Sequence, residues 1–434
     1  MLADGPLLVD ETEQTPSRPW HRKTTVIAAL SVVAAACGED ETPSGDTGGA
    51  IEPAKVYSSI GETEGELELI AWHGYTEDGT SEGGDDFDWI TPFEEETGCN
   101  VNVTYADSSD EMVTLMRQGG GSVYDGVSAS GDASNRLIAG GDVGSIDTAL
   151  FPAFADVIAP LNPDGGTNTE HYVVDGNVYG APYMYGPNFL MYNTEEVTPA
   201  PTSWDVTFEA DSPYSGQVTA YDSPIFIADA AMYLMAHNPD LGITDPYELT
   251  QEQFDAAVEL LKQQNELISS YWALYTDEID GFVDGSMVVG TAWPINLSLA
   301  ELDAPVDQVV PSEGMTGWAD TWMISANAPH PNCMLTWMDY TMRPEVQAEV
   351  AVWYGAAGSN PLSCDATREL LVEFYGEGAD AAVDTVRYGN CGDAEFLDSL
   401  FLWKTPLPDC GDDRGDVCID YSEWTQAWTE IRGA

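Results

Sequence analysis

The feature that most restricts the fold is an alternation of β-forming and helical runs over residues 66–130. The runs 66–75 and 99–106 are rich in β-forming residues, and the segment between them spaces three apolar side chains almost as a helix does. A second helical run follows at 110–121 and a further strand at 124–130. Repeated strand–helix–strand units predict a parallel sheet flanked by helices, with right-handed crossovers.

The second half of the chain continues this α/β pattern. Residues 249–268 predict an amphipathic helix that opens with a capping box, Thr250 with Gln253. A buried strand is predicted at 285–293, and two helices separated by a proline at 334–354. With 434 residues, of which 43% are apolar, the chain can fill two cores of about 150 to 200 residues each, so two lobes are expected.

The run GMTGWADTW, residues 314–322, places Trp318, Asp320 and Trp322 at alternate positions. In a strand, alternate side chains share one face. An ammonium group over an indole gains about 0.5 to 2 kcal/mol, and a carboxylate beside it forms a charge-assisted pair. This run therefore predicts a site for a cation.

The charge balance excludes one class of partner. The chain has 13 Lys plus Arg against 75 Asp plus Glu, a net charge of −62, so it lacks the basic footprint of a nucleic-acid-binding protein. The acidity indicates a surface adapted to salty or acidic surroundings, electrostatic steering of cationic ligands, or both.

The N-terminal region predicts export. A basic start at residues 21–23 precedes a short apolar stretch and small residues that lead into Cys37, a pattern too short for a membrane span. Because an acidic tract follows the cysteine, residues 1–37 resemble a bacterial lipoprotein signal peptide with Cys37 lipidated; a plain secretory signal is the alternative. Residues 38–65 are poorly hydrophobic and predict a disordered acidic tether.

The other six cysteines are even in number, which in an exported protein predicts up to three disulfides. The candidates are Cys99, Cys333, Cys364, Cys391, Cys410 and Cys418. Six cysteines allow fifteen connectivities, and short spacing favours the pair Cys410 and Cys418. No CxxC pair occurs and the five histidines are scattered, so neither a metal site nor a cofactor is predicted.

Ten further stretches carry a family resemblance through their order. They are AWHGY, FEEETGCNV, YDGVSAS, YGAPYMYG, FLMYN, TSWD, GTAWPIN, VVPSEGMTGWADTWMIS, TMRPEV and a closing WTQAWTEIRGA. In this order they resemble the substrate-binding lipoproteins of polyamine ABC transporters, the spermidine/putrescine-binding family, from about residue 66 to the end. The most specific pieces are PSEG-x-x-x-W-x-D and the helix entering RPEV.

The resemblance implies a two-lobed α/β fold of the type II periplasmic-binding-protein kind. Its sheets would be mostly parallel and flanked by helices, with the ligand cleft between lobes that close on a hinge. Family-like crossings near 187, 318 and 355 would give lobe 1 as 66–187 plus 319–354, and lobe 2 as 188–318 plus 355–434. Cys99 and Cys333 would then share lobe 1 and form a pair, which leaves Cys364 with Cys391.

The resemblance also implies a ligand site in which aromatic rings enclose methylene groups and carboxylates hold ammonium groups. The matching positions are Trp72, Tyr75, Ser130, Asp222, Trp293, Trp318 and Asp320. Two candidates depart from the family pattern: Asp132 replaces an aromatic residue, and Lys404 replaces a glutamine. A lysine in the site would repel an amine unless an acid neutralised it, so Lys404 either lines the pocket or points elsewhere.

The resulting hypothesis is an exported, lipid-anchored, monomeric receptor at the outer face of the cytoplasmic membrane or in the periplasm. It would capture putrescine or spermidine and deliver it to an ABC transporter permease in the inner membrane, without catalysis, cofactor or nucleic acid. One alternative keeps the receptor fold but binds a sugar or a zwitterionic, amino-acid-like ligand, whose carboxylate Lys404 would contact. A weaker alternative is a carboxylate-pair hydrolase that uses Asp222 and Asp320.

Overall fold

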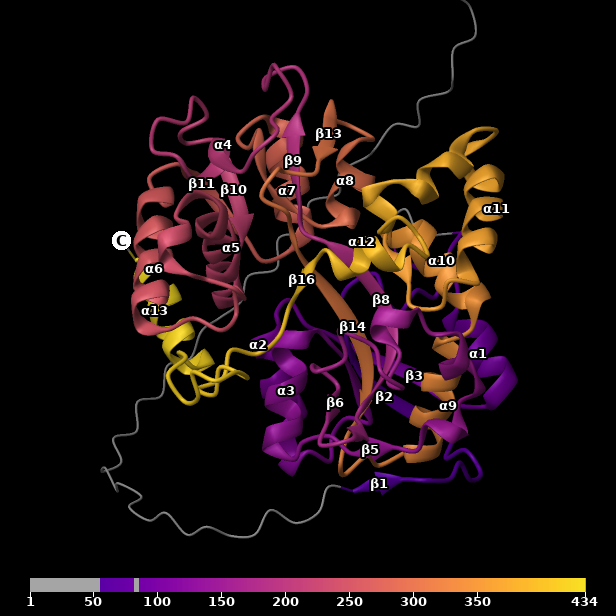
Figure 1. The fold of residues 1–434 in the computed structure, drawn as a ribbon. Helices are drawn as coiled ribbons and strands as arrows, with labels where there is room; N and C mark the ends of the chain where they lie inside the picture. The colour runs from indigo at the N-terminus through magenta and orange to yellow at the C-terminus, as the bar shows by residue number, and fades with distance from the viewer. Residues whose placement is uncertain (1–54, 82–85, 434) are drawn as a thin grey trace, which may run out of the picture. The chain divides into compact units, whose positions relative to one another are not determined.

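The computed structural model describes residues 55–81 and 86–433, which form two mixed β-sheets, a small third sheet and the helices around them (Figure 1). The predicted signal peptide with Cys37, and residues 38–54 of the predicted tether, lie outside the described residues. No helix within the described ranges combines the length and the apolar character needed to span a bilayer.

The larger sheet has seven strands. In spatial order they are β15 (Ala357–Gly358), β8 (Gly180–Pro187), β14 (Thr316–Ile324), β4 (Gly126–Ala129), β2 (Glu66–Ala71) and β3 (Asn100–Tyr105), with β16 (Phe401–Leu402) beside β14. Strands β2, β3 and β4 are parallel, as predicted, and α1 (Ile90–Thr97) and α2 (Ser109–Met116) lie between them in the chain. Strand β14 is antiparallel to both β4 and β8.

The second sheet has five strands. Their order is β11 (Ile268–Trp272), β10 (Val218–Tyr221), β12 (Val289–Ala292), β9 (Phe189–Asn193) and β13 (Val306–Val309). Strand β10 is parallel to β11 and β12, whereas β9 is antiparallel to β12 and β13. Both sheets are therefore mixed rather than mostly parallel. The antiparallel pairs arise where the chain passes directly from one sheet to the other, from β8 to β9 and from β13 to β14.

A small sheet corrects the prediction of a disordered tether for its described part, residues 55–65. It contains β1 (Val56–Tyr57), β5 (Ser145–Ile146), β7 (Asn177–Val178) and β6 (Val173–Val174), and β1 pairs with β5. Tyr57 is buried, and its hydroxyl donates to the backbone oxygen of Ser325 at 2.6 Å. Residues 55–65 therefore pack on the folded part, because one aromatic side chain and a strand pairing hold them in place.

The remaining helices enclose the sheets. They are α3 (Gly131–Gly140), α4 (Asp205–Phe208), α5 (Ile227–His237), α6 (Gln251–Gln264), α7 (Tyr275–Asp284), α8 (Pro294–Ala300), α9 (Pro331–Thr341), α10 (Pro344–Tyr354), α11 (Ser363–Tyr375), α12 (Ala394–Asp398) and α13 (Tyr421–Arg432). The capping box of Thr250 and Gln253 opens α6 as predicted. Helices α5 and α13 both pack against α6 (Figure 1).

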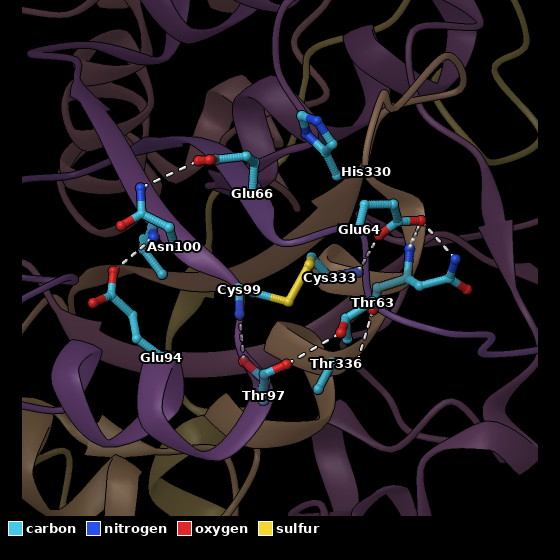
Figure 2. Close-up of a disulfide and its surroundings, with 12 residues drawn as sticks. Thr63, Glu64, Glu66, Glu94, Thr97, Cys99, Asn100, His330, Cys333 and Thr336 are labelled. Carbon is cyan, nitrogen blue, oxygen red and sulfur yellow. Dashed lines mark hydrogen bonds between the residues drawn. A yellow bond between two sulfur atoms is a disulfide. The ribbon is translucent and has the colours of Figure 1, made fainter.

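Three disulfides join the predicted pairs, Cys99 with Cys333, Cys364 with Cys391, and Cys410 with Cys418. The first pair links the start of β3 to α9 across 234 residues of sequence (Figure 2). Beside it, the carboxylate of Glu64 accepts hydrogen bonds from the backbone N–H groups of Asn332 and Cys333, at 3.1 and 3.0 Å. Glu64 thus supplies a cap to the first turn of α9 from a distant part of the chain.

We propose lobe boundaries that follow sheet membership. Strand β8 ends at Pro187 and β9 begins at Phe189, which places the first boundary at residue 188. All of β14 lies in the larger sheet, so the second boundary falls in 310–315 rather than at 318. Strand β15 joins the same sheet and α11 packs against α10, so residues 355–402 go with the first lobe rather than the second.

Candidate functional site

A narrow cavity lies where side chains from both sheets meet. Its lining residues are Trp72, Ser130, Trp293, Trp318, Asp320, Tyr354 and Trp403. Trp72 and Ser130 directly follow the parallel strands β2 and β4, and Trp293 follows β12 of the other sheet. The carboxyl ends of strands are the usual place for a ligand in α/β folds. The cavity is about 10 Å³, room for roughly one water molecule, so a larger solute requires the rings to move apart.

Asp320 is the acid of this cavity, and it is 4% exposed. Its Oδ2 accepts a hydrogen bond from the Tyr75 hydroxyl at 2.8 Å, whereas its Oδ1 has no hydrogen-bond partner among the described residues. Burial raises the pKa of Asp320 to about 7, although the hydroxyls of Ser130 and Tyr75 oppose the rise. A cation at Oδ1 would compensate the desolvation of this carboxylate.

Aromatic rings form the walls of the cavity and meet edge to face. The ring centroids of Trp72 and Trp293 are 6.1 Å apart at 69°, and those of Trp318 and Tyr354 are 5.7 Å apart at 79°. Trp403 lies 6.3 Å from Trp293. The indole N–H groups of all four tryptophans lack an acceptor among the described residues. These walls offer apolar surface and ring faces to a ligand, together with several free donors.

Two adjoining cavities share Trp72 and Trp293 with the first one. Asp107 lines both of them, and His73 lines one, where its Nε2 lies 3.2 Å from Asp107 Oδ1. Asp222 lines the other. The pair of indoles is therefore surrounded by carboxylates at three places, Asp320, Asp107 and Asp222.

Asp222 already has partners. Its Oδ1 accepts a hydrogen bond from Trp428 Nε1 at 2.8 Å, and its Oδ2 pairs with the guanidinium of Arg432. An ammonium group at Asp222 would therefore share this carboxylate with Arg432. The predicted role of Asp222 as a cation ligand remains a prediction.

Asp132 and Lys404 lie outside the lining of the indole cavity, which corrects their inclusion among its residues. Asp132 Oδ1 accepts a hydrogen bond from the Ser109 hydroxyl at 2.7 Å, and its carboxylate faces Arg136. Lys404 Nζ lies 2.8 Å from Asp245 and 2.6 Å from Glu248, and its side chain lines a separate cavity. For Lys404 the physical reason is alternation, since neighbours in an extended chain point in opposite directions and Trp403 points inward. Asp132 lies in the first turn of α3, where its carboxylate faces Ser109 and Arg136.

The structure brings together five of the predicted residues in the lining and leaves others out. Trp72, Ser130, Trp293, Trp318 and Asp320 line the cavity, and Tyr75 lies behind it, bonded to Asp320. Sequence reasoning missed Trp403, Tyr354 and Asp107. The signal for Asp107 was its position just beyond the end of the parallel strand β3, where ligand-contacting side chains collect.

The geometry defines a class of protein. Two mixed sheets connected by several crossings, with a cavity walled by side chains of both at their junction, are the architecture of a two-lobed solute receptor. The chain belongs to the bacterial extracellular solute-binding protein family, whose sequence model matches residues 88–367. Members of this family bind solutes for ABC transporters and are not enzymes.

Named relatives agree with the predicted resemblance. The chain is 25% identical over 314 residues to the putrescine/agmatine-binding protein of Pseudomonas aeruginosa, covering 66% of this chain and 80% of that protein. It is 25% identical over 285 residues to the spermidine/putrescine-binding periplasmic protein of Escherichia coli, covering 65% and 75%. The crystal structure of the spermidine/putrescine ABC transporter substrate-binding protein of Streptococcus pneumoniae superposes with a TM-score of 0.60 at 19% identity, covering 84% and 97%. The predicted family and two-lobed fold are confirmed.

Proposed function

We propose that this protein captures a polyamine, putrescine or spermidine, in the indole cavity and delivers it to an ABC transporter permease. The observation that carries the proposal is Asp320, a buried carboxylate among rings that favour cations, one of whose oxygens has no partner in the described part of the chain. One ammonium group would lie at Asp320 Oδ1, and the methylene groups would lie between the indoles. Export and a lipid anchor at Cys37 belong to the same proposal and rest on the signal sequence.

The surroundings of the cavity support a cation over a neutral or anionic ligand. Its lining contains one acid and no basic side chain, and Asp107 lies in the adjoining cavities. Lys404, which would have repelled an amine, is paired with Asp245 and Glu248 elsewhere. The relatives in Pseudomonas aeruginosa and Escherichia coli are named as putrescine/agmatine-binding and spermidine/putrescine-binding proteins.

One observation favours a second candidate ligand. The indole N–H groups of Trp72, Trp293, Trp318 and Trp403 are buried without an acceptor in the described part of the chain. A polyamine offers them no acceptor, whereas the hydroxyl groups of a sugar or the carboxylate of a zwitterion would. The same receptor fold binding such a ligand is therefore the alternative that the experiment must separate.

Calorimetric titration of the protein without residues 1–37 separates the two candidates. Putrescine, spermidine, a set of amino acids and a set of sugars are titrated into the wild type and into Asp320→Asn. For a polyamine receptor we expect saturable binding of an amine, weakened about 30-fold or more in Asp320→Asn, because a buried charge pair loses its anion. Binding of sugars or amino acids alone would contradict the proposal.

The matched control is Asp125→Asn. Asp125 is also a fully buried aspartate, at the opposite end of β4 from Ser130, and it accepts hydrogen bonds from the backbone N–H groups of Glu68 and His330. It lines none of the three joined cavities. This variant should be less stable but bind the amine with unchanged affinity. An equal loss of affinity in both variants would assign the effect of Asp320→Asn to the fold.

A further inference from the structure

A second cluster of polar side chains lies away from the indole cavity. It contains Asp205, His237 and Glu313, which each contribute one potential metal-ligand atom, and these atoms all lie within 4.8 Å of one another. His237 Nε2 is 2.8 Å from Glu313 Oε1 and 3.6 Å from Asp205 Oδ1. The three residues are at the start of α4, at the end of α5 and in the connection from β13 to β14. The three residues are far apart in the sequence, so no sequence motif predicted that they would form a cluster.

Two of the stretches that carry the family resemblance, TSWD (202–205) and PSEG (311–314), build this cluster. The backbone N–H of Ser312 donates to Thr202 O at 2.9 Å, and the Trp204 indole donates to Gly314 O at 2.9 Å. The Ser203 hydroxyl donates to Glu313 Oε1 at 2.5 Å. The two stretches thereby hold the Glu313 carboxylate, which is 2% exposed, in a fixed position.

The imidazole of His237 is also fixed. Its ring stacks on that of Tyr233, with centroids 4.1 Å apart and planes at 14°. This stacking points Nε2 at the two carboxylates of Asp205 and Glu313. Two ligand positions of the cluster are therefore preset by packing and hydrogen bonds, and the third, Asp205, is the most exposed of the three.

Around Asp205 and His237 the cluster has more acceptors than donors, whereas Glu313 also accepts from the Ser203 and Ser312 hydroxyls and the Trp204 backbone N–H. The Tyr233 hydroxyl is 2.8 Å from Asp205 Oδ1 and 2.7 Å from Glu209 Oε1, but it has only one proton to donate. His237 Nε2 likewise faces two carboxylates with at most one N–H. Within the described ranges, the ion pairs of Asp205 and Glu313 involve His237 alone. A divalent cation would supply the missing positive charge.

We propose that Asp205, His237 and Glu313 bind a divalent metal ion of borderline softness, with Zn²⁺ as the probe. One imidazole and two carboxylates suit such an ion. Ligands about 2.0 to 2.1 Å from a tetrahedral Zn²⁺ lie roughly 3.3 Å from one another, and the observed 2.8 and 3.6 Å bracket that spacing. Asp205 and His237 are 50% and 37% exposed, so water can complete the coordination.

The place of this site in the fold gives it a consequence. Glu313 belongs to the connection between β13 and β14, which joins the five-stranded and seven-stranded sheets. Asp205 and His237 belong to the helices α4 and α5, beside the five-stranded sheet. A bound ion would fasten the connection to α4 and α5. This inference is independent of the identity of the transported solute.

The experiment is calorimetric titration of Zn²⁺ into the exported protein after treatment with a chelator. An excess of Mg²⁺ is present throughout, because this harder ion occupies exposed carboxylates without competing well for an imidazole. We expect one Zn²⁺ per chain, with affinity lowered about tenfold or more in His237→Asn. Asp205→Asn, a change at an exposed side chain, should weaken Zn²⁺ binding while thermal unfolding stays close to that of the wild type.

The control is His330→Asn. His330 also pairs with an aspartate, since its Nδ1 lies 2.9 Å from Asp125, but it lies outside the cluster. This variant should bind Zn²⁺ as the wild type does. Equal Zn²⁺ affinity in the wild type and in His237→Asn would overturn the proposal, as would a lack of saturable binding in the wild type. His237 would then serve only as a hydrogen-bond and ion-pair partner of Glu313.

Discussion

At the scale of single residues, two buried aspartates with similar acidity differ in what they offer a ligand. Burial raises the pKa of both Asp229 and Asp320 to about 7. Both oxygens of Asp229 accept hydrogen bonds, from the Tyr221 and Thr316 hydroxyls at 2.5 and 2.9 Å. Asp320 has one such bond, from Tyr75, with the Ser130 hydroxyl nearby, and its Oδ1 has no hydrogen-bond partner among the residues that the structure describes. Desolvation alone does not mark a binding residue; the unfilled acceptor distinguishes Asp320.

The raised pKa of Asp320 predicts that polyamine affinity increases with pH. Below about pH 7 the carboxyl group of the free protein is mostly protonated, and an ammonium ligand must displace that proton before it can pair with the carboxylate. Affinity should rise up to about tenfold per pH unit between pH 5.5 and 7, and level off above that range. Calorimetry in buffers of different ionisation enthalpy should detect a proton released on binding near pH 6.

The Asp320→Asn variant provides the control for this pH dependence. Its residual affinity should be nearly independent of pH over the same interval, because the group that exchanges the proton is gone. If the wild type bound polyamine equally well at pH 5.5 and 7.5, the ammonium group would not lie at Asp320.

Part of the site was predictable because its residues lie in family-like stretches on regular elements: Trp72 and Trp293 directly follow strands, and Asp320 lies within β14. Trp403 was not predictable, because it reaches the site through β16. This strand has only two residues, and no local sequence pattern predicts its pairing with β14. Lys404 was a candidate because it replaces a glutamine of the resembled family, although alternation along an extended chain places it on the opposite side from Trp403. Local patterns find residues that regular elements position, and they miss those that depend on tertiary pairing.

At the scale of elements, most helices and strands followed from hydrophobic spacing and caps, whereas the ordered part of the predicted tether did not. Residues 55–65 have the polar composition of a disordered segment. They are ordered because Tyr57 is buried and because the Glu64 carboxylate accepts hydrogen bonds from the N-terminus of α9. A few specific contacts outweigh composition here, and single-residue properties do not reveal such contacts.

The capping of α9 by Glu64 is testable at this scale. Glu64→Ala removes the acceptor for the N–H groups of Asn332 and Cys333, and it should lower the free energy of unfolding by about 0.5 to 2 kcal/mol. Denaturant unfolding measures the change. Glu62→Ala removes the same charge from an exposed position in the same segment, and it should have little effect. Equal effects of the two substitutions would show that charge, rather than capping, accounts for the loss.

At the scale of the whole described fold, two of the connections between the sheets are joined to each other. Asn188, the single residue between β8 and β9, donates from its backbone to Thr316 O at 2.9 Å and from its side chain to Thr316 Oγ1 at 2.8 Å. Thr316 begins β14, directly after the connection from β13. Any rotation of one sheet against the other therefore acts on two coupled segments, which is a suitable arrangement for hinge closure around a solute.

The net charge of −62 makes stability depend on salt for the chain as a whole. With 13 Lys plus Arg against 75 Asp plus Glu, at most 13 of the acids can be paired one to one with these cations, so repulsion between carboxylates exceeds attraction. Raising the ionic strength from 0.1 to 1 M shortens the screening length from about 10 to 3 Å. Because folding brings the charges closer together, this screening favours the folded state. The midpoint of thermal unfolding should therefore rise with KCl.

The same screening should weaken polyamine binding, so salt should have opposite effects on stability and on affinity. Long-range attraction of a cation to an acidic surface speeds its association, and salt weakens that attraction. The contact with Asp320 is buried and much less screened, so the dissociation rate should change little. Stopped-flow measurements at 0.1 and 1 M KCl should thus place the loss of affinity in the association rate, while thermal unfolding under the same conditions shows a gain in stability. A midpoint that falls with KCl would mean that ion pairs, rather than repulsion, dominate the electrostatics of this fold.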